Sequence, residues 1–180
     1  LTLLDNFEWF LDRKNEIRLV AVTVDSNAAE PIQFSTPSVF PGIMKGNKLP
    51  IGDAGLGMYY SAPATMPLYM RLSLLVIEDD TETRDVGKAI REVREMSEFK
   101  TILDVAKGLA SAANPAYGTL IAIGDAVTGL VGRLLEQNKD DLVAYFAATY
   151  TAAFDNLGIG KHTFHQDRHA RVQYEILAKV

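Results

Sequence analysis

The sequence of 180 residues contains no cysteine. Disulfides, thiol nucleophiles and thiolate metal sites are therefore excluded together. The absence leaves the compartment open, because a chain of this length buries enough surface to fold without cross-links. The sequence begins at Leu1, without the basic leader of a signal peptide. We expect a processed chain, for which an extracellular location is one option.

Long apolar runs are also missing. Residues 108–124 are uncharged and largely apolar but are interrupted by Asn114 and Pro115, and the apolar run at residues 142–154 is short. A helix that crosses a bilayer needs about 20 apolar residues. We therefore expect a soluble chain.

The sequence has no excess of basic residues. It contains 18 Lys and Arg against 23 Asp and Glu, which gives a net charge of −5, and the two signs are interspersed. A nucleic-acid-binding surface normally shows a basic patch or stripe. Nucleic acid is therefore not an expected partner.

Nucleotide-binding and hydrolase motifs are absent. A P-loop read onto Gly160 and Lys161 would have Asp155 where its first glycine belongs and His162 in place of Ser or Thr. The glycines at 52, 55 and 57 do not form a GxGxxG run, and neither GxSxG nor HExxH occurs. No catalytic signature favours an enzyme.

Strand-forming segments flank a helical centre. Residues 17–24 are β-branched and apolar and end in a turn cluster, and residues 68–77 are apolar on both faces in their second half, which predicts a central strand. Prolines restrict residues 31–35 to an edge. The predicted strands are residues 17–24, 31–35, 58–61, 68–77, 142–150 and 171–180.

Residues 83–138 form the predicted helical block. Apolar residues recur at helical spacing from Val86 to Met96, Ser97 is a candidate cap for a second helix, and Asn114-Pro115 is a start signal for a third. The third helix has four glycines, which cost about 1 kcal/mol each relative to alanine. Close approach of the alanine-rich second helix would compensate. Asp125, opposite the apolar face, is expected in solvent.

Strands, then helices, then strands again argue against repeated βαβ units. We predict an α+β, mainly β, fold with residues 1–180 as a single domain. Its scaffold is an antiparallel β-sandwich of roughly seven to eight strands. Residues 1–15 form an N-terminal arm, and residues 83–138 are a three-helix insertion that packs on one face or end.

Carboxylates lie at the ends of the predicted strands. The helical block must leave and rejoin the sheet, so we expect Glu78–Asp80 and Asp140–Asp141 to lie close together. Calcium takes six to eight oxygen ligands and would neutralise such a group. The predicted calcium ligands are Asp25, Asp79, Asp80, Asp140, Asp141 and Asp155. In the alternative interpretation, Asp80 caps the first helix and the other carboxylates are solvated.

This arrangement resembles a C2-type sandwich, in which acidic loops at one end of the strands hold calcium. The resemblance is one of architecture. No stretch matches a C2 motif and a large helical insertion is unusual for that family, so no residue role is carried over from it.

Three histidines, His162, His165 and His169, lie within eight residues, beside Asp155 and Asp167. Imidazole is a common ligand of zinc, copper and nickel. Their spacing would place all three on one face of a helix, whereas Gly158 and Gly160 favour a loop with surface histidines.

The leading hypothesis is a non-enzymatic binding or assembly module, with calcium as its predicted cofactor. Its partner is another protein or a second copy of the chain, added at a sandwich edge strand. One alternative is a metal-dependent hydrolase that uses His162, His165 and His169. Another is a membrane-active or lipid-binding protein that uses the helical insertion. A membrane surface is not favoured, because the third helix lacks a polar face rich in Lys and Arg.

Overall fold

The computed structural model describes ten stretches of the chain. Strands and helices occupy similar shares of them, about 40% and 38%. The fold is therefore α+β, with nearly as much helix as strand. The described residues are 2–3, 15–26, 29–36, 39–49, 56–61, 66–78, 86–112, 117–137, 141–166 and 169–178.

The larger of two antiparallel sheets has β2 (Asn15–Asp25) and β5 (Tyr69–Glu78) at its centre. On one side, β3 (Ile32–Ser35) pairs with the second half of β2 and β4 (Phe40–Ile43) with its first half. On the other side, β6 (Asp141–Thr151) pairs with β5 along its whole length. The central position of β5 agrees with its sequence, because a strand that is apolar on both faces must be covered on both.

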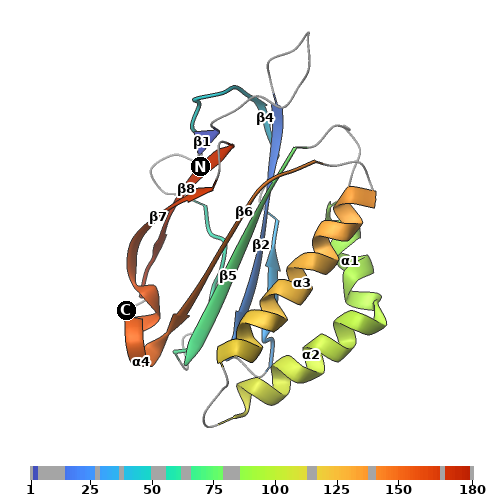
Figure 1. Ribbon diagram of the computed structural model, residues 1–180, viewed down its shortest axis with the longest axis vertical. Helices are drawn as coiled ribbons and strands as arrows, with labels where there is room; N and C mark the ends of the chain where they lie inside the picture. The colour runs from blue at the N-terminus through green and yellow to red at the C-terminus, as the bar shows by residue number, and fades with distance from the viewer. Residues whose placement is uncertain are drawn as a thin grey trace.

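The smaller sheet has the order β1 (Thr2–Leu3), β8 (Ala170–Ile176), β7 (Gly160–Gln166). A single helical turn, α4 (Ala152–Asp155), and a 3-10 turn, η1 (Asn156–Gly158), connect β6 to β7. The chain therefore passes directly from the edge of the larger sheet into the smaller one (Figure 1).

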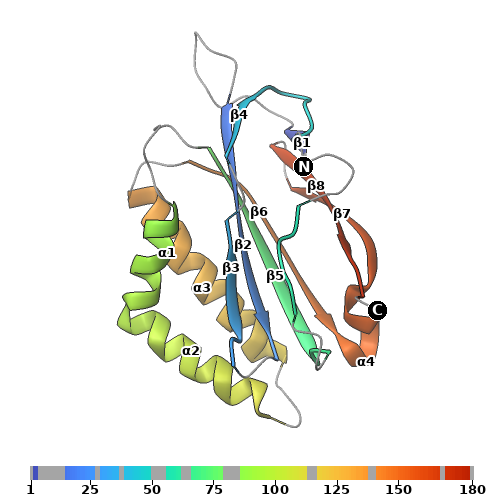
Figure 2. The ribbon, with the colours of Figure 1, turned by 180° about the vertical axis from the view of Figure 1, so that it is seen from behind.

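Three helices, α1 (Val86–Glu95), α2 (Ser97–Ala110) and α3 (Tyr117–Gln137), lie in the chain between β5 and β6. They cover one face of the larger sheet, and the smaller sheet lies on the opposite side (Figures 1 and 2). Helix α3 contacts β2, β5 and β6, while α1 and α2 pack on α3. None of the described helices is long and apolar enough to cross a membrane.

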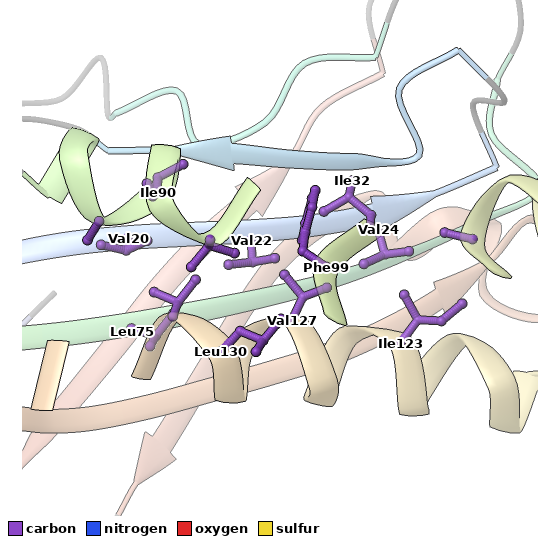
Figure 3. Close-up of a cluster of buried hydrophobic side chains, with 14 of the residues drawn as sticks. Val20, Val22, Val24, Ile32, Leu75, Ile90, Phe99, Ile123, Val127 and Leu130 are labelled. Carbon is purple, nitrogen blue, oxygen red and sulfur yellow. The ribbon is translucent and has the colours of Figure 1, made fainter. Parts of the chain in front are cut away.

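Strand alternation divides the core between the two faces of the larger sheet. On the helical face, Val20, Val22 and Val24 of β2 meet Ile123, Val127 and other residues of α3 (Figure 3). On the opposite face, Leu19 and Ala21 of β2 belong to a second cluster that also includes Ala170 and Val172 of β8. The apolar face predicted for the third helix is thus buried where it is described, apart from Tyr117, which is 38% exposed.

Several predicted local features differ in the structure. Residues 58–61, predicted as a strand, are not one. Conversely, β4 was not predicted, because Pro41 and Gly42 within it are typical turn residues, and Gly42 does adopt a positive φ of 72°. Ser97 is the first residue of α2, and Met96 is the N-cap, without a side-chain hydrogen bond. The predicted capping residue of the first helix, Asp80 or Thr81, lies outside the described residues.

Candidate functional site at the β6 edge

The outer edge of β6 has no strand beside it among the described residues, and Figure 1 views the larger sheet from this side. An unpaired edge exposes backbone N–H and C=O groups, and proteins usually protect such edges with short strands, prolines or lysines. The edge strands β1, β3, β4 and β7 show these devices, and β8, which β1 pairs only at Ala170 and Arg171, carries the charged residues Arg171 and Glu175 instead. β3 and β4 have four residues each and are preceded or interrupted by Pro31 and Pro41, β1 has two residues, and β7 carries Lys161.

β6 lacks these devices. It has 11 residues, contains no proline or lysine, and is uncharged from Leu142 to Thr151. Its register with β5 is regular from Ala144 to Thr151 and shifts only between Ala144 and Leu142. The result is a long, neutral and regularly paired edge strand.

A polar cluster holds β6 to the helical face of the sheet. Arg71 of β5 forms a salt bridge with Asp125 of α3, and its Nη1 donates to Thr149 Oγ1 of β6 at 3.0 Å. The Tyr145 hydroxyl donates to Asp125 Oδ1 at 3.4 Å and lies 3.4 Å from Ser73 Oγ. The side chain of Arg71 is 9% exposed and that of Asp125 is 54% exposed. The arginine is thus the buried member of the pair.

Gly124 leaves the space that Arg71 occupies. A Cβ at position 124 would lie 2.3 Å from Arg71 Cδ, whereas a Cβ at Gly118, Gly129 or Gly132 would meet no atom within 4 Å. The expectation that the second helix closely approaches these glycines is therefore wrong. The close contact in α3 is made by an arginine from the sheet.

Aromatic residues hold the other face of β6. The hydroxyl of Tyr150 hydrogen-bonds to that of Tyr174 in β8, and the His162 ring lies between them, with centroid distances of 5.0 and 5.1 Å. His162 Nε2 lies 2.5 Å from the Gly158 carbonyl oxygen, which can only accept, so this nitrogen carries the proton. Burial raises the pKa of Tyr150 and of Tyr174, and both hydroxyls stay protonated at neutral pH.

Two of the predicted acidic ligands, Asp25 and Asp141, lie at opposite ends of the larger sheet. Glu78 and Asp141 are paired residues of β5 and β6, so the strand that leads into the helical block and the strand that follows it do meet. Asp25 pairs instead with Met70, eight residues away along β5, or about 26 Å. Asp25 and Asp141 therefore cannot ligate one ion. Asp79, Asp80 and Asp140 lie outside the described residues.

Asp25 and Asp155 each accept a hydrogen bond from another group of the protein. Asp25 is 1% exposed and accepts a hydrogen bond from the Tyr59 hydroxyl at 2.5 Å. Asp155 accepts one from the Thr151 backbone N–H at 2.6 Å, which holds the turn after β6. Among the described residues, no three His, Asp or Glu side chains are grouped as a metal site would require.

Tyr69 beside Asp25 gives a prediction at alkaline pH. Burial, and then the negative charge of Asp25, raise the pKa of Tyr69 to about 12. The unfolded chain ionises this phenol near pH 10, so the stability it contributes is complete below pH 10 and lost as pH rises towards 12, by up to about 1.4 kcal/mol per pH unit. We expect Tyr69→Phe to change stability little at pH 8 and to reduce the loss at pH 11, in urea unfolding followed by circular dichroism. An equal alkaline loss in both proteins would contradict this assignment.

The histidines do not converge where they are described. His162 pairs with Tyr174, whereas Ala170, which follows His169, pairs with Gln166. His162 and His169 are thus separated by about five residues along the strands, or roughly 16 Å. His165 lies in β7, and its side chain is outside the described part of the structure. Nothing in this geometry favours the hydrolase alternative.

No protein-family model matches the chain, and neither does any of the curated proteins or solved structures with which it was compared. A proposal of function therefore depends on the geometry alone.

Proposed function

We propose that the protein is a non-enzymatic binding or assembly module that accepts a partner strand at the outer edge of β6. The observation that carries this proposal is the contrast between β6, which is long and neutral, and the other edges, which are short or carry proline or charged residues. In strand addition, backbone hydrogen bonds supply affinity and side chains on alternate faces supply specificity.

The contacts on both faces of β6 support this proposal. Tyr145 and Thr149 are bonded on the helical face, and Tyr150 is bonded on the other. These bonds hold the strand in its extended form before any partner arrives. Binding then has to order only the incoming strand, and preorganisation of this kind increases affinity by reducing the entropy lost.

A synthetic peptide provides a test. We expect a fluorescently labelled peptide with the sequence of residues 142–150 to bind the protein saturably in an anisotropy titration, because it supplies a neutral strand of matching length. The control is the same peptide with the backbone amides from Ala144 to Ala148 N-methylated, which removes donors on both of its edges. Equal binding of the two peptides, or binding of neither, would contradict strand addition.

Two sequence predictions accompany this proposal. We propose that the two sheets are the layers of the predicted β-sandwich, and support comes from the hydrophobic cluster in which Ala170 and Val172 of β8 join residues of the larger sheet. Calcium dependence stays a prediction, with the Glu78–Asp141 end of the sheet as its proposed location. Calorimetric titration with calcium, and melting in EDTA, test it; an absence of heat and of a stability change would remove the metal.

A further inference from the structure

The partner strand can be specified further, on the basis of the proposed function. We propose that a second copy of this chain occupies the edge, with the two β6 strands antiparallel about a twofold axis beside Ala147. The two larger sheets would then form one continuous antiparallel sheet, with the helices of both copies on one face and both smaller sheets on the other.

Symmetry restricts the registers that such a dimer can adopt. In a continuous antiparallel sheet, the twofold axis is perpendicular to the sheet and paired side chains point to the same face. Residues that pair across the axis must therefore be an even number of positions apart in the sequence. It follows that the axis lies beside one residue, which pairs with its own copy. The regular part of β6 runs from Ala144 to Thr151, and Ala147 lies at its middle.

Side-chain size selects the axis at Ala147. This register pairs every aromatic residue of the segment with a small one: Phe146 with Ala148, Tyr145 with Thr149, and Tyr150 with Ala144. An axis at Tyr145 or Phe146 places that aromatic residue against itself, and an axis at Ala148 places Phe146 against Tyr150. Cross-strand neighbours lie ~4.5–5.5 Å apart between Cβ atoms. Pairs of one large and one small side chain fit this spacing on both faces.

The charge of β6 is also compatible with a second copy. Each chain carries a net charge of −5, so two copies repel each other wherever their acidic residues meet. The segment from Leu142 to Thr151 has no charged residue, and Asp141 lies at its outer end. In the proposed register, Asp141 of one copy lies beyond Thr151 of the other, so the two Asp141 residues are at opposite ends of the paired segment.

Cysteine cross-linking tests both the dimer and its register, because the chain has no cysteine of its own. In Ala147→Cys, the two new thiols face each other across the axis with Cα atoms ~4.5–5.5 Å apart, within the range of ~4.4–6.8 Å for disulfides. In the control Leu142→Cys, at an exposed position of the same strand, the two thiols are about ten residues apart, or roughly 33 Å. Both variants are oxidised at equal concentration, after circular dichroism has confirmed the native fold.

We expect the Ala147→Cys variant to become mostly covalent dimer on non-reducing gels, the Leu142→Cys variant to stay mostly monomer, and the unmodified chain to sediment as a dimer. Equal cross-linking of the two variants, or none at position 147 with a monomeric unmodified chain, would overturn the proposed dimer. If the labelled peptide still binds in that case, strand addition stands and only the identity of the partner is wrong. If the peptide also fails to bind, the proposed function fails with it.

Discussion

Gly158→Ala is expected to lower the free energy of unfolding by about 3 kcal/mol. Gly158 has φ 67°, and a left-handed residue with a Cβ costs ~1–2 kcal/mol. The new Cβ would also lie 2.3 Å from the Tyr150 ring, which cannot easily move because it is bonded to Tyr174 and packed on His162. Overpacking of this kind adds ~1–3 kcal/mol.

The matched control for this variant is Gly46→Ala. Gly46 has φ 83°, but a Cβ there would meet no atom within 4 Å, so only the backbone strain of ~1–2 kcal/mol applies. Urea unfolding of both variants gives the comparison. Equal losses of stability would show that Tyr150 is free to move, and would contradict the rigid aromatic support assigned to β6.

Asp125→Ala is expected to destabilise the protein more than Arg71→Met, although the two residues form one ion pair. Removing Asp125 leaves a buried guanidinium with Thr149 as its remaining partner. Loss of one member of a buried pair costs ~3–5 kcal/mol. Here the expected cost is about 2 kcal/mol, because water reaches the half-exposed site of the aspartate and alanine has a higher helix propensity. In Arg71→Met, the half-exposed Asp125 stays hydrated and the methionine side chain fills the space of the arginine. The expected loss of stability is therefore about 1 kcal/mol or less.

Chemical denaturation of the two single variants and the double variant tests this order. The double variant should be about as stable as Arg71→Met, because once the buried guanidinium is removed, the loss of Asp125 leaves no buried charge unpaired. A larger loss for Arg71→Met than for Asp125→Ala would mean that the arginine acts mainly through its packing, and that the charge pair does not hold α3 to the edge of the sheet.

Local sequence patterns identified the elements in which one apolar pattern continues along the whole length. The runs of apolar and β-branched residues in β2 and β5 extend over nearly the whole of each strand, so these strands were predicted to within two residues at each end. The apolar stripe of α3 similarly predicted that Leu120, Ile123 and Val127 would be buried. Such patterns are strong because one substitution among many does not change the period.

The candidate site could not be predicted in the same way, because it depends on contacts between residues far apart in the sequence. Arg71 and Asp125 are 54 residues apart, and Tyr150 and Tyr174 are 24 apart. A signal was present, since an arginine interrupts an apolar strand and an aspartate lies mid-helix beside Gly124. Neither residue identifies its partner without the sheet order. The edge position of β6 depends on strand order in the same way.

Amide hydrogen exchange, resolved by residue in β6, tests the outer edge of this strand most directly. The amides that bond to β5 should exchange slowly in the free protein. The alternate amides, which point outward, should exchange faster in protein dilute enough to be monomeric, and become protected when the labelled peptide is added or when the concentration is raised until two copies pair. Protection confined to those alternate β6 amides is the expected result. Protection that appears elsewhere and leaves the outward β6 amides unchanged would contradict strand addition at this edge.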